Sequence, residues 1–237
     1  MTEIPFLTKS PVLIDDRGTF SPTLTRFTHK DHLQLRKEWV QTNVSINDKA
    51  FTIRGLHYQD PYPQTKLVKV IQGSIIDFAV NIEIEPDFGK TYKFEMKAGD
   101  MAYIPKGYCH AFITLEPNTI VQYLVDEDYY PKHEGSISWK SVPEVYESIK
   151  QYEDQLIISD KDINAITLER YKLSKKPSLD QLFREYQPFK NDKWNLTIVK
   201  DNGNDMIVMA PNGDTQHMTK QQYESHKIKR EEDDRSN

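Results

Sequence analysis

Cysteine is nearly absent from this chain, which contains a single one, Cys109. One thiol cannot form an intrachain disulfide, so the fold is not a disulfide framework of the kind found in small secreted proteins. It is also too few for a zinc site built from cysteine ligands. A lone thiol fits a reducing compartment, and we therefore predict a cytoplasmic protein.

Long apolar runs and an excess of basic charge are absent as well. No stretch approaches the roughly 18 apolar residues that a membrane-spanning helix needs, and the first residues lack the pattern of a signal peptide. Lysine and arginine number 31 against 36 aspartates and glutamates, which gives a formal net charge of −5. This balance offers no electrostatic support for nucleic-acid binding. We expect neither a membrane nor a nucleic acid as a partner.

The chain is rich instead in short β-prone segments between about residues 50 and 140. Hydrophobic residues make up 37 % and charged residues 28 % of the chain, a globular composition. Turn signals such as Gln72-Gly73 and Phe88-Gly89 separate segments rich in Val, Ile, Phe and Tyr: LVKVIQG, SIIDFAVNIEI, YKFEMKAGD, MAYIPKGY, HAFITL and TIVQYLV. Such spacing predicts an all-β sandwich or barrel. The imperfect alternation of SIIDFAVNI is typical of a strand that is buried partly on both faces.

Helical signals are few. Residues 28–37 are compatible with a short helix, and Ser178 to Gln181 form a capping box after Pro177 that predicts another. We place both helices outside the barrel.

The character of the chain changes after about residue 170. A lysine-rich linker and the second helix precede short strands separated by Asn202-Gly203 and Asn212-Gly213, and Asn-Gly is a strong hairpin signal. The last residues are a charged run typical of a tail. We predict a barrel domain over residues 1–170 and, over 171–237, a linker, a short helix, a small β-hairpin module and the tail.

Two of the seven histidines, His57 and His110, lie in β-rich segments flanked by turns. A metal site would need further ligands, but there is no His-x-His pair and Tyr58 follows His57 directly, so we expect no metal. Cys109 precedes His110, and neighbours along a strand point to opposite faces. Cys109 is therefore interpreted as a half-buried structural thiol rather than a nucleophile.

Seven segments resemble, in order and spacing, the dTDP-4-dehydrorhamnose 3,5-epimerase family. They are RGLHYQ (54–59), QTKLVKVIQG (64–73), DFAV (77–80), DFGK (87–90), IPKGYCHAF (104–112), DYYPKHEGSISW (128–139) and SDKD (159–162). The resemblance runs from about residue 10 to 168. It implies a cupin-type double-stranded β-helix, that is, a jelly-roll barrel, with a few short helices and no cofactor.

The resemblance also implies catalytic roles. His57 would be the base, Asp162 the carboxylate that supports it, and Tyr123 the acid on the opposite face of the sugar. Lys66 would face the C4 oxygen. Proton exchange next to a ketone needs such a base, such an acid and a donor for the enolate oxygen. We expect a C4-keto sugar to be epimerised at C3, C5 or both.

Substrate contacts are implied in the same way. The guanidinium groups of Arg17 and Arg54 would hold the diphosphate, because their planar forks suit phosphate oxygens. The other implied contacts are Gln41, Asn43, His110 at the pocket rim, and Glu134. Two residues depart from the family pattern. Pro22 stands where a nucleotide-contacting Glu is usual, and a proline cannot make that contact. Asn81 stands where the family often has Asp.

The resulting prediction is an enzyme of deoxysugar and cell-surface polysaccharide biosynthesis, converting dTDP-4-dehydro-6-deoxyglucose to dTDP-4-dehydrorhamnose. Its partners would be the nucleotide-sugar substrate and, because the family pairs through strands near the N-terminus, a second copy of the chain. Two alternatives stay open at this point. One is a sugar-nucleotide 3,4-ketoisomerase of the same build. The other is a non-catalytic sugar-nucleotide-binding or assembly module.

Overall fold

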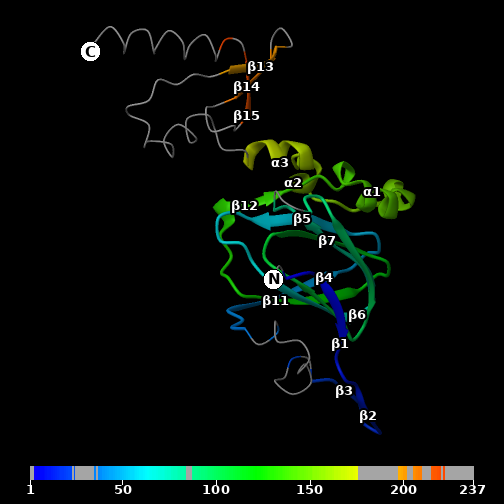
Figure 1. The fold of residues 1–237 in the computed structure, drawn as a ribbon. Coiled ribbons are helices and arrows are strands. Elements are labelled where there is room, and N and C mark those ends of the chain that lie inside the picture. Colours follow the sequence, from blue (N-terminus) through cyan, green and yellow to red (C-terminus); the bar gives the residue numbers. More distant parts are fainter. Residues whose placement is uncertain are drawn as a thin grey trace. The chain divides into compact units, whose positions relative to one another are not determined.

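A computed structural model describes residues 3–22, 24, 35, 37–83, 87–175, 197–201, 205–209, 215–219 and 221. The chain divides into two compact units, Met1–Lys176 and Pro177–Asn237. Figure 1 follows the chain from the N-terminus in blue to the C-terminus in red. Along the described stretches no helix is long and apolar enough to cross a membrane.

Two five-stranded antiparallel sheets make up the first unit (Figure 1). In spatial order the first sheet contains β1 (Phe6–Lys9), β9 (Asp100–Ile104), β6 (Lys66–Gln72), β11 (Thr119–Val125) and β4 (Gln41–Asn47). The second contains β12 (Glu134–Ser136), β5 (Ile53–Gln59), β10 (Tyr108–Thr114), β7 (Ser74–Asn81) and β8 (Thr91–Lys97). The predicted all-β barrel is confirmed, with each sheet ordered as in a jelly roll.

The core comprises three apolar clusters, one of which, around Leu67, Met101 and Tyr103, lies on the outer face of the first sheet. Alternate residues of β6, β7, β10 and β11 point between the sheets and pack there, among them Val68, Ile75 and Phe112. The other face of the second sheet carries a separate apolar layer that includes Phe78 and Cys109. β7 and β10 are therefore buried on both faces, which confirms the interpretation of SIIDFAVNI.

Helices cover the outer layer of the second sheet (Figure 1). They are the 3-10 helices η2 (Pro131–His133), η3 (Trp139–Ser141) and η4 (Lys150–Gln155) and the α-helices α1 (Pro143–Ile149), α2 (Asp160–Ile163) and α3 (Leu168–Lys175). Val145, Ile149 and Tyr171 bury their side chains against the sheet. Sequence patterns did not predict these helices. The two that they did predict lie outside the described residues, apart from Leu35 and Lys37.

A hairpin and a small sheet complete the described structure. β2 (Leu13–Asp15) pairs with β3 (Gly18–Phe20) in an exposed hairpin. In the second unit, β13 (Thr197–Asp201), β14 (Asp205–Met209) and β15 (Thr215–Thr219) form an antiparallel sheet in that order. Strands therefore lie on both sides of each Asn-Gly pair, as the hairpin signals predicted.

Candidate active site

The predicted histidines lie on paired strands. β5 and β10 are neighbours in the second sheet, and His57 stands opposite His110 in their register. Tyr108 and Phe112, which alternate with His110, belong to the apolar layer between the sheets. His110 therefore faces the barrel interior, and so does His57, because its neighbour Leu56 packs in the outer layer.

His57 has a carboxylate partner. Its Nε2 lies 2.7 Å from Oδ1 of Asp162, which is 4 % exposed. Asp162 is placed by the first turn of α2, where the side chain of Ser159 caps the helix by accepting a hydrogen bond from the Asp162 N–H. The dyad predicted from RGLH and SDKD is thus within hydrogen-bond distance.

Asp162 is held in its ionised form. Burial by itself would raise its pKa, but hydrogen bonds from His57, the Ser136 hydroxyl and the Gly55 backbone N–H lower the pKa to about 2. An ionised carboxylate can only accept, so His57 donates its Nε2–H to Asp162. Nδ1 then carries the free lone pair, which a general base needs.

A second carboxylate lies on the Nδ1 side of His57. Glu134 Oε1 is 4.0 Å from Nδ1, while Oε2 accepts a hydrogen bond of 2.7 Å from the Tyr129 hydroxyl and lies 2.5 Å from the Lys161 ammonium. Burial by itself would raise the pKa of Glu134, but these contacts lower the pKa overall. Motif-based prediction included Glu134 but missed Tyr129 and Lys161, although DYYP and SDKD contain them.

The structure places His110 inside the barrel. It is 7 % exposed, and its Nε2 lies 2.7 Å from Oδ2 of fully buried Asp77. Its contact with the substrate stays a prediction. The other oxygen of Asp77 is buried without a hydrogen-bond partner among the described residues. Asp77 was part of the DFAV motif but had no predicted role. Its partner His110 was recognised only as a substrate contact.

Gly55 explains why the motif has a glycine two residues before His57. Its φ is +117°, and a Cβ built there would lie 2.4 Å from the carbonyl oxygen of His110 and 2.6 Å from the Cβ of Ala111. Only glycine combines this backbone with so close an approach. The two histidine-bearing strands can therefore come together at this point.

Lys66 and Tyr123 come from the opposite sheet. Val125 of β11 pairs with Lys66 of β6, and Tyr123 packs against the inner apolar layer. Burial lowers the pKa of Lys66, and the negative charge of Glu134 partly opposes this. Burial raises the pKa of Tyr123, while the charge of nearby Arg54 opposes the increase. Tyr123 is therefore a protonated phenol at neutral pH.

A cavity of about 160 Å³ opens beside Lys66. Its lining includes Tyr58, Gln64, Tyr108 and Tyr171 but not His57. The catalytic candidates lie instead along the space between the two sheets. Lys66 borders both regions.

Polar side chains from β4 line the same interior. Gln41 donates to Asn43 through Nε2 at 2.7 Å, and Arg54 donates from Nε to Asn47 Oδ1 at 2.9 Å. Alternate residues of β4 face inward, so Gln41, Asn43 and Asn47 form one row. Three predicted contacts, Gln41, Asn43 and Arg54, thus lie in this row or bind to it.

Arg17 is not brought to this site. It lies in the tight turn of the exposed β2–β3 hairpin and pairs with Asp15, Nη2 to Oδ2 at 2.5 Å. Figure 1 shows this hairpin away from β5 and β12. Within one protomer the structure does not bring Arg17 and Arg54 together, and their joint role in holding the diphosphate stays a prediction.

Cys109 is more buried than predicted. Its side chain is fully enclosed in the outer layer, and burial raises the pKa of its thiol to about 12. The predicted separation from His110 is confirmed, since the two side chains point into different layers. A neutral thiol packed among apolar groups is not a nucleophile.

The site is therefore of the acid–base class, built in a cupin-type barrel from a carboxylate-supported histidine, an ammonium and a phenol. Over the described ranges, no group of three or more His, Cys, Asp or Glu side chains could hold a metal ion.

The chain belongs to the dTDP-4-dehydrorhamnose 3,5-epimerase family, whose model matches residues 3–170. The epimerase of Methanothermobacter thermautotrophicus is 33 % identical over 156 residues, covering 65 % of this chain and 83 % of the relative. That of Shigella flexneri is 33 % identical over 171 residues, covering 69 % and 91 %.

Solved structures agree with this assignment. The dTDP-6-deoxy-D-glucose-3,5-epimerase of Legionella pneumophila, in complex with dTDP-4-keto-L-rhamnose, is 29 % identical with a TM-score of 0.64, covering 71 % of this chain and 90 % of that one. The Bacillus anthracis epimerase with TDP and PPi bound is 34 % identical with a TM-score of 0.59, covering 69 % and 93 %.

Proposed function

We propose that this chain epimerises a nucleotide-linked 4-keto-6-deoxy sugar, converting dTDP-4-dehydro-6-deoxyglucose to dTDP-4-dehydrorhamnose. The observation that carries the proposal is the 2.7 Å pair between His57 and ionised Asp162 inside a barrel of this family. The pair and the family match favour the epimerase over a 3,4-ketoisomerase or a non-catalytic binding module.

The proposed chemistry begins at Nδ1 of His57. This nitrogen removes the proton next to the C4 ketone, and Asp162 stabilises the imidazolium that forms. The electrons move onto the C4 oxygen, where the Lys66 ammonium stabilises the negative charge. Tyr123 then donates its proton to the carbon from the other face, which inverts the centre. Exchange with water restores His57 and Tyr123.

The substrate class is supported by the relatives. The Legionella pneumophila enzyme was solved with a dTDP-keto sugar, and the Bacillus anthracis enzyme with TDP and PPi. In this chain Arg54 borders the interior and would contact the diphosphate. Gln41, Asn43, His110 and Glu134 are the proposed contacts for the rest of the ligand.

We also propose a cytoplasmic homodimer. The outward row of edge strand β4 is apolar and exposed, with Val44 at 59 % and Ile46 at 64 %. The β2–β3 hairpin likewise exposes Leu13 and Ile14. A second copy packed on these surfaces would cover them. Arg17 would then be available to the partner's site rather than its own.

Incubation with dTDP-4-keto-6-deoxyglucose in deuterated water, followed by NMR, tests the activity. Deuterium at C3 and C5 supports the double epimerase, and deuterium at one carbon supports a mono-epimerase. The proposal fails if neither this substrate nor its UDP and CDP analogues exchange.

Two variants assign the roles in the same assay. His57→Ala should lower the exchange rate by about 10²- to 10⁴-fold, the usual contribution of a general base. Tyr123→Phe should retain proton removal but impair the inversion, so that deuterium returns mainly without change of configuration.

A further inference from the structure

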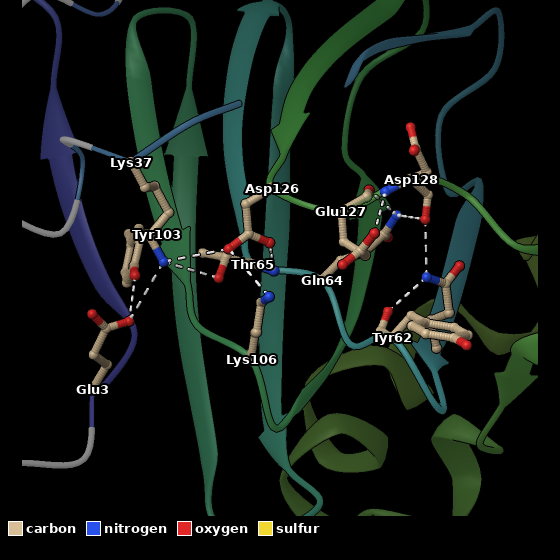
Figure 2. A network of polar contacts seen from close by, with 11 residues as sticks. Glu3, Lys37, Tyr62, Gln64, Thr65, Tyr103, Lys106, Asp126, Glu127 and Asp128 are labelled. Atoms are coloured by element: carbon tan, nitrogen blue, oxygen red, sulfur yellow. Dashed lines mark hydrogen bonds and ion pairs between the residues drawn. The ribbon is translucent and has the colours of Figure 1, made fainter. Parts of the chain in front are cut away.

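Residues 127–130 form an irregular segment between β11 and η2. Within the part of the chain that the structure describes, Glu127, Asp128 and Tyr129 make no backbone–backbone hydrogen bond. Backbone polar groups need partners, so such a segment keeps one conformation only if side chains bind it. Figure 2 shows the segment running alongside the loop that contains Tyr62 and Gln64.

Glutamine side chains bind this segment. Gln64 donates through Nε2 to the carbonyl oxygens of Glu127 at 2.9 Å and Asp128 at 3.2 Å (Figure 2). Gln59 donates to the same Asp128 carbonyl at 3.0 Å and accepts from the Tyr130 N–H at 2.8 Å. A glutamine amide suits this task because it offers donors and an acceptor at one end.

A third glutamine completes the set. The Oε1 of Gln41 accepts from the Tyr129 N–H at 3.3 Å. Gln41 comes from β4, Gln59 ends β5 and Gln64 precedes β6, so three separate elements of the barrel hold the segment. We call Gln41, Gln59 and Gln64 the glutamine clamp. Two of its members occur in RGLHYQ and QTKLV, where the proposed chemistry gives them no role.

The clamp is connected to the proposed base, His57, through Tyr129 and Glu134. Tyr129, in the middle of the clamped segment, donates its hydroxyl to Glu134, whose other oxygen is 4.0 Å from Nδ1 of His57. Tyr129 is 47 % exposed, so its ring is open to a ligand that enters beside His57. The position of the Tyr129 backbone determines where its ring points, and the hydrogen bonds of the clamp hold that backbone in place.

We propose that the glutamine clamp is a set of positioning residues that holds Tyr129 against Glu134 and thereby sets the affinity of the site for the nucleotide sugar. This inference rests on the proposed function. Gln59 and Gln64 act through Tyr129 and touch none of the reacting atoms, whereas Gln41 is also a proposed contact for the ligand. Loss of the clamp should therefore raise KM and leave kcat nearly unchanged.

Gln64 is the member to change, because it is only half-buried, unlike Gln59, and its loss should not unfold the barrel. Gln64→Glu keeps the size but turns a donor into a carboxylate facing two carbonyl oxygens. We expect KM and the Kd for dTDP to rise about tenfold, which corresponds to the loss of one or two hydrogen bonds. Gln64→Lys retains a donor and should restore both values to near those of the wild type.

Gln72→Glu is the matched control. Gln72 lies at the other end of β6, and its Nε2 donates to the Asn118 carbonyl at 2.9 Å at the surface. The same substitution there breaks the same kind of bond far from Tyr129. KM and the Kd for dTDP should be unchanged.

A double-mutant cycle with Tyr129→Ala tests whether the clamp acts through Tyr129. In the Tyr129→Ala background, Gln64→Glu should have no further effect on KM. The clamp proposal is overturned if the two effects multiply independently, or if Gln64→Glu behaves like Gln72→Glu.

Calorimetric titration with dTDP measures the Kd of each variant without turnover. Absence of deuterium exchange in the wild type, with the dTDP results as expected, would overturn the proposed function alone.

Discussion

His57 and Asp162 are 105 positions apart in the sequence, yet Nε2 of one lies 2.7 Å from Oδ1 of the other. The histidine comes from the middle of strand β5 and the aspartate from the short helix α2 beside it. The pair defines the tautomer of His57 and with it the nitrogen that can act as a base.

Asp162→Asn should therefore impair catalysis more than folding. The carboxylate accepts from His57 and Ser136 on one oxygen and from the Gly55 N–H on the other, and an amide cannot accept at both positions. We expect kcat to fall on the order of 10²- to 10⁴-fold. Asp160→Asn, at an exposed position of the same helix, is the control and should retain full activity in the deuterium-exchange assay.

The same pair predicts an acid-dependent loss of stability. The pKa of Asp162 is lowered to about 2 in the folded protein, below its usual value near 4, so the folded state favours the ionised form. Its contribution, about 2 kcal/mol, is complete above about pH 4 and is lost as the pH falls towards 2. Denaturant unfolding between pH 6 and about 2 measures the free energy of unfolding of the wild type and of Asp162→Asn. The difference between the two free energies should shrink as the pH falls. A constant difference would contradict the prediction.

Lys66 should show opposite effects on activity and stability. Along the described ranges its ammonium has no hydrogen bond or ion pair, and burial lowers its pKa, so holding the charge there is costly. Lys66→Met should lower kcat about 10²- to 10³-fold. It should also raise Tm by about 2–4 °C, which corresponds to about 1 kcal/mol. Lys69→Met serves as the control, because Lys69 points away from the site and donates to Ser10; its kcat should be unchanged.

Gly55→Ala tests the close approach of β5 and β10. The added methyl group would collide with the His110 carbonyl, and the positive φ adds strain, so we expect a loss of at least about 2 kcal/mol in the free energy of unfolding. Gly99→Ala shares the positive φ, at +93°, but has open space around the new Cβ. The difference between the two variants in urea unfolding isolates the collision. Equal losses would show that strain alone matters.

The outer row of β4 is the proposed dimer surface. Ile46→Lys places a charge on an apolar strand face that is 64 % exposed in the protomer. Burying an unpaired charge is costly, so the variant should be monomeric by size-exclusion chromatography with light scattering. Ile71→Lys, also at an exposed position (44 %) but on β6, should leave the mass unchanged. A wild-type protein of monomer mass would refute the dimer directly.

Short-range patterns predicted much of the architecture. Turn signals and runs of β-branched and aromatic residues identified the strands from Lys66 to Val125, because alternation and turn chemistry act within a few residues. The helices between Pro143 and Lys175 escaped prediction. They are short, and short helices are stable only through packing. Val145 and Tyr171 find their apolar partners on the outer face of the second sheet.

By itself, the sequence determined the all-β class and the order of the family motifs, and with them His57, Lys66 and Asp162 as the proposed catalytic residues. The tertiary structure alone decided which of them meet. Strand register and the packing of α2 bring Asp162 to His57 and bury His110 against Asp77, while the β2–β3 hairpin carries Arg17 away. Contacts of this kind join residues far apart in the chain. They arise from the packing of whole sheets and helices, which no local pattern encodes.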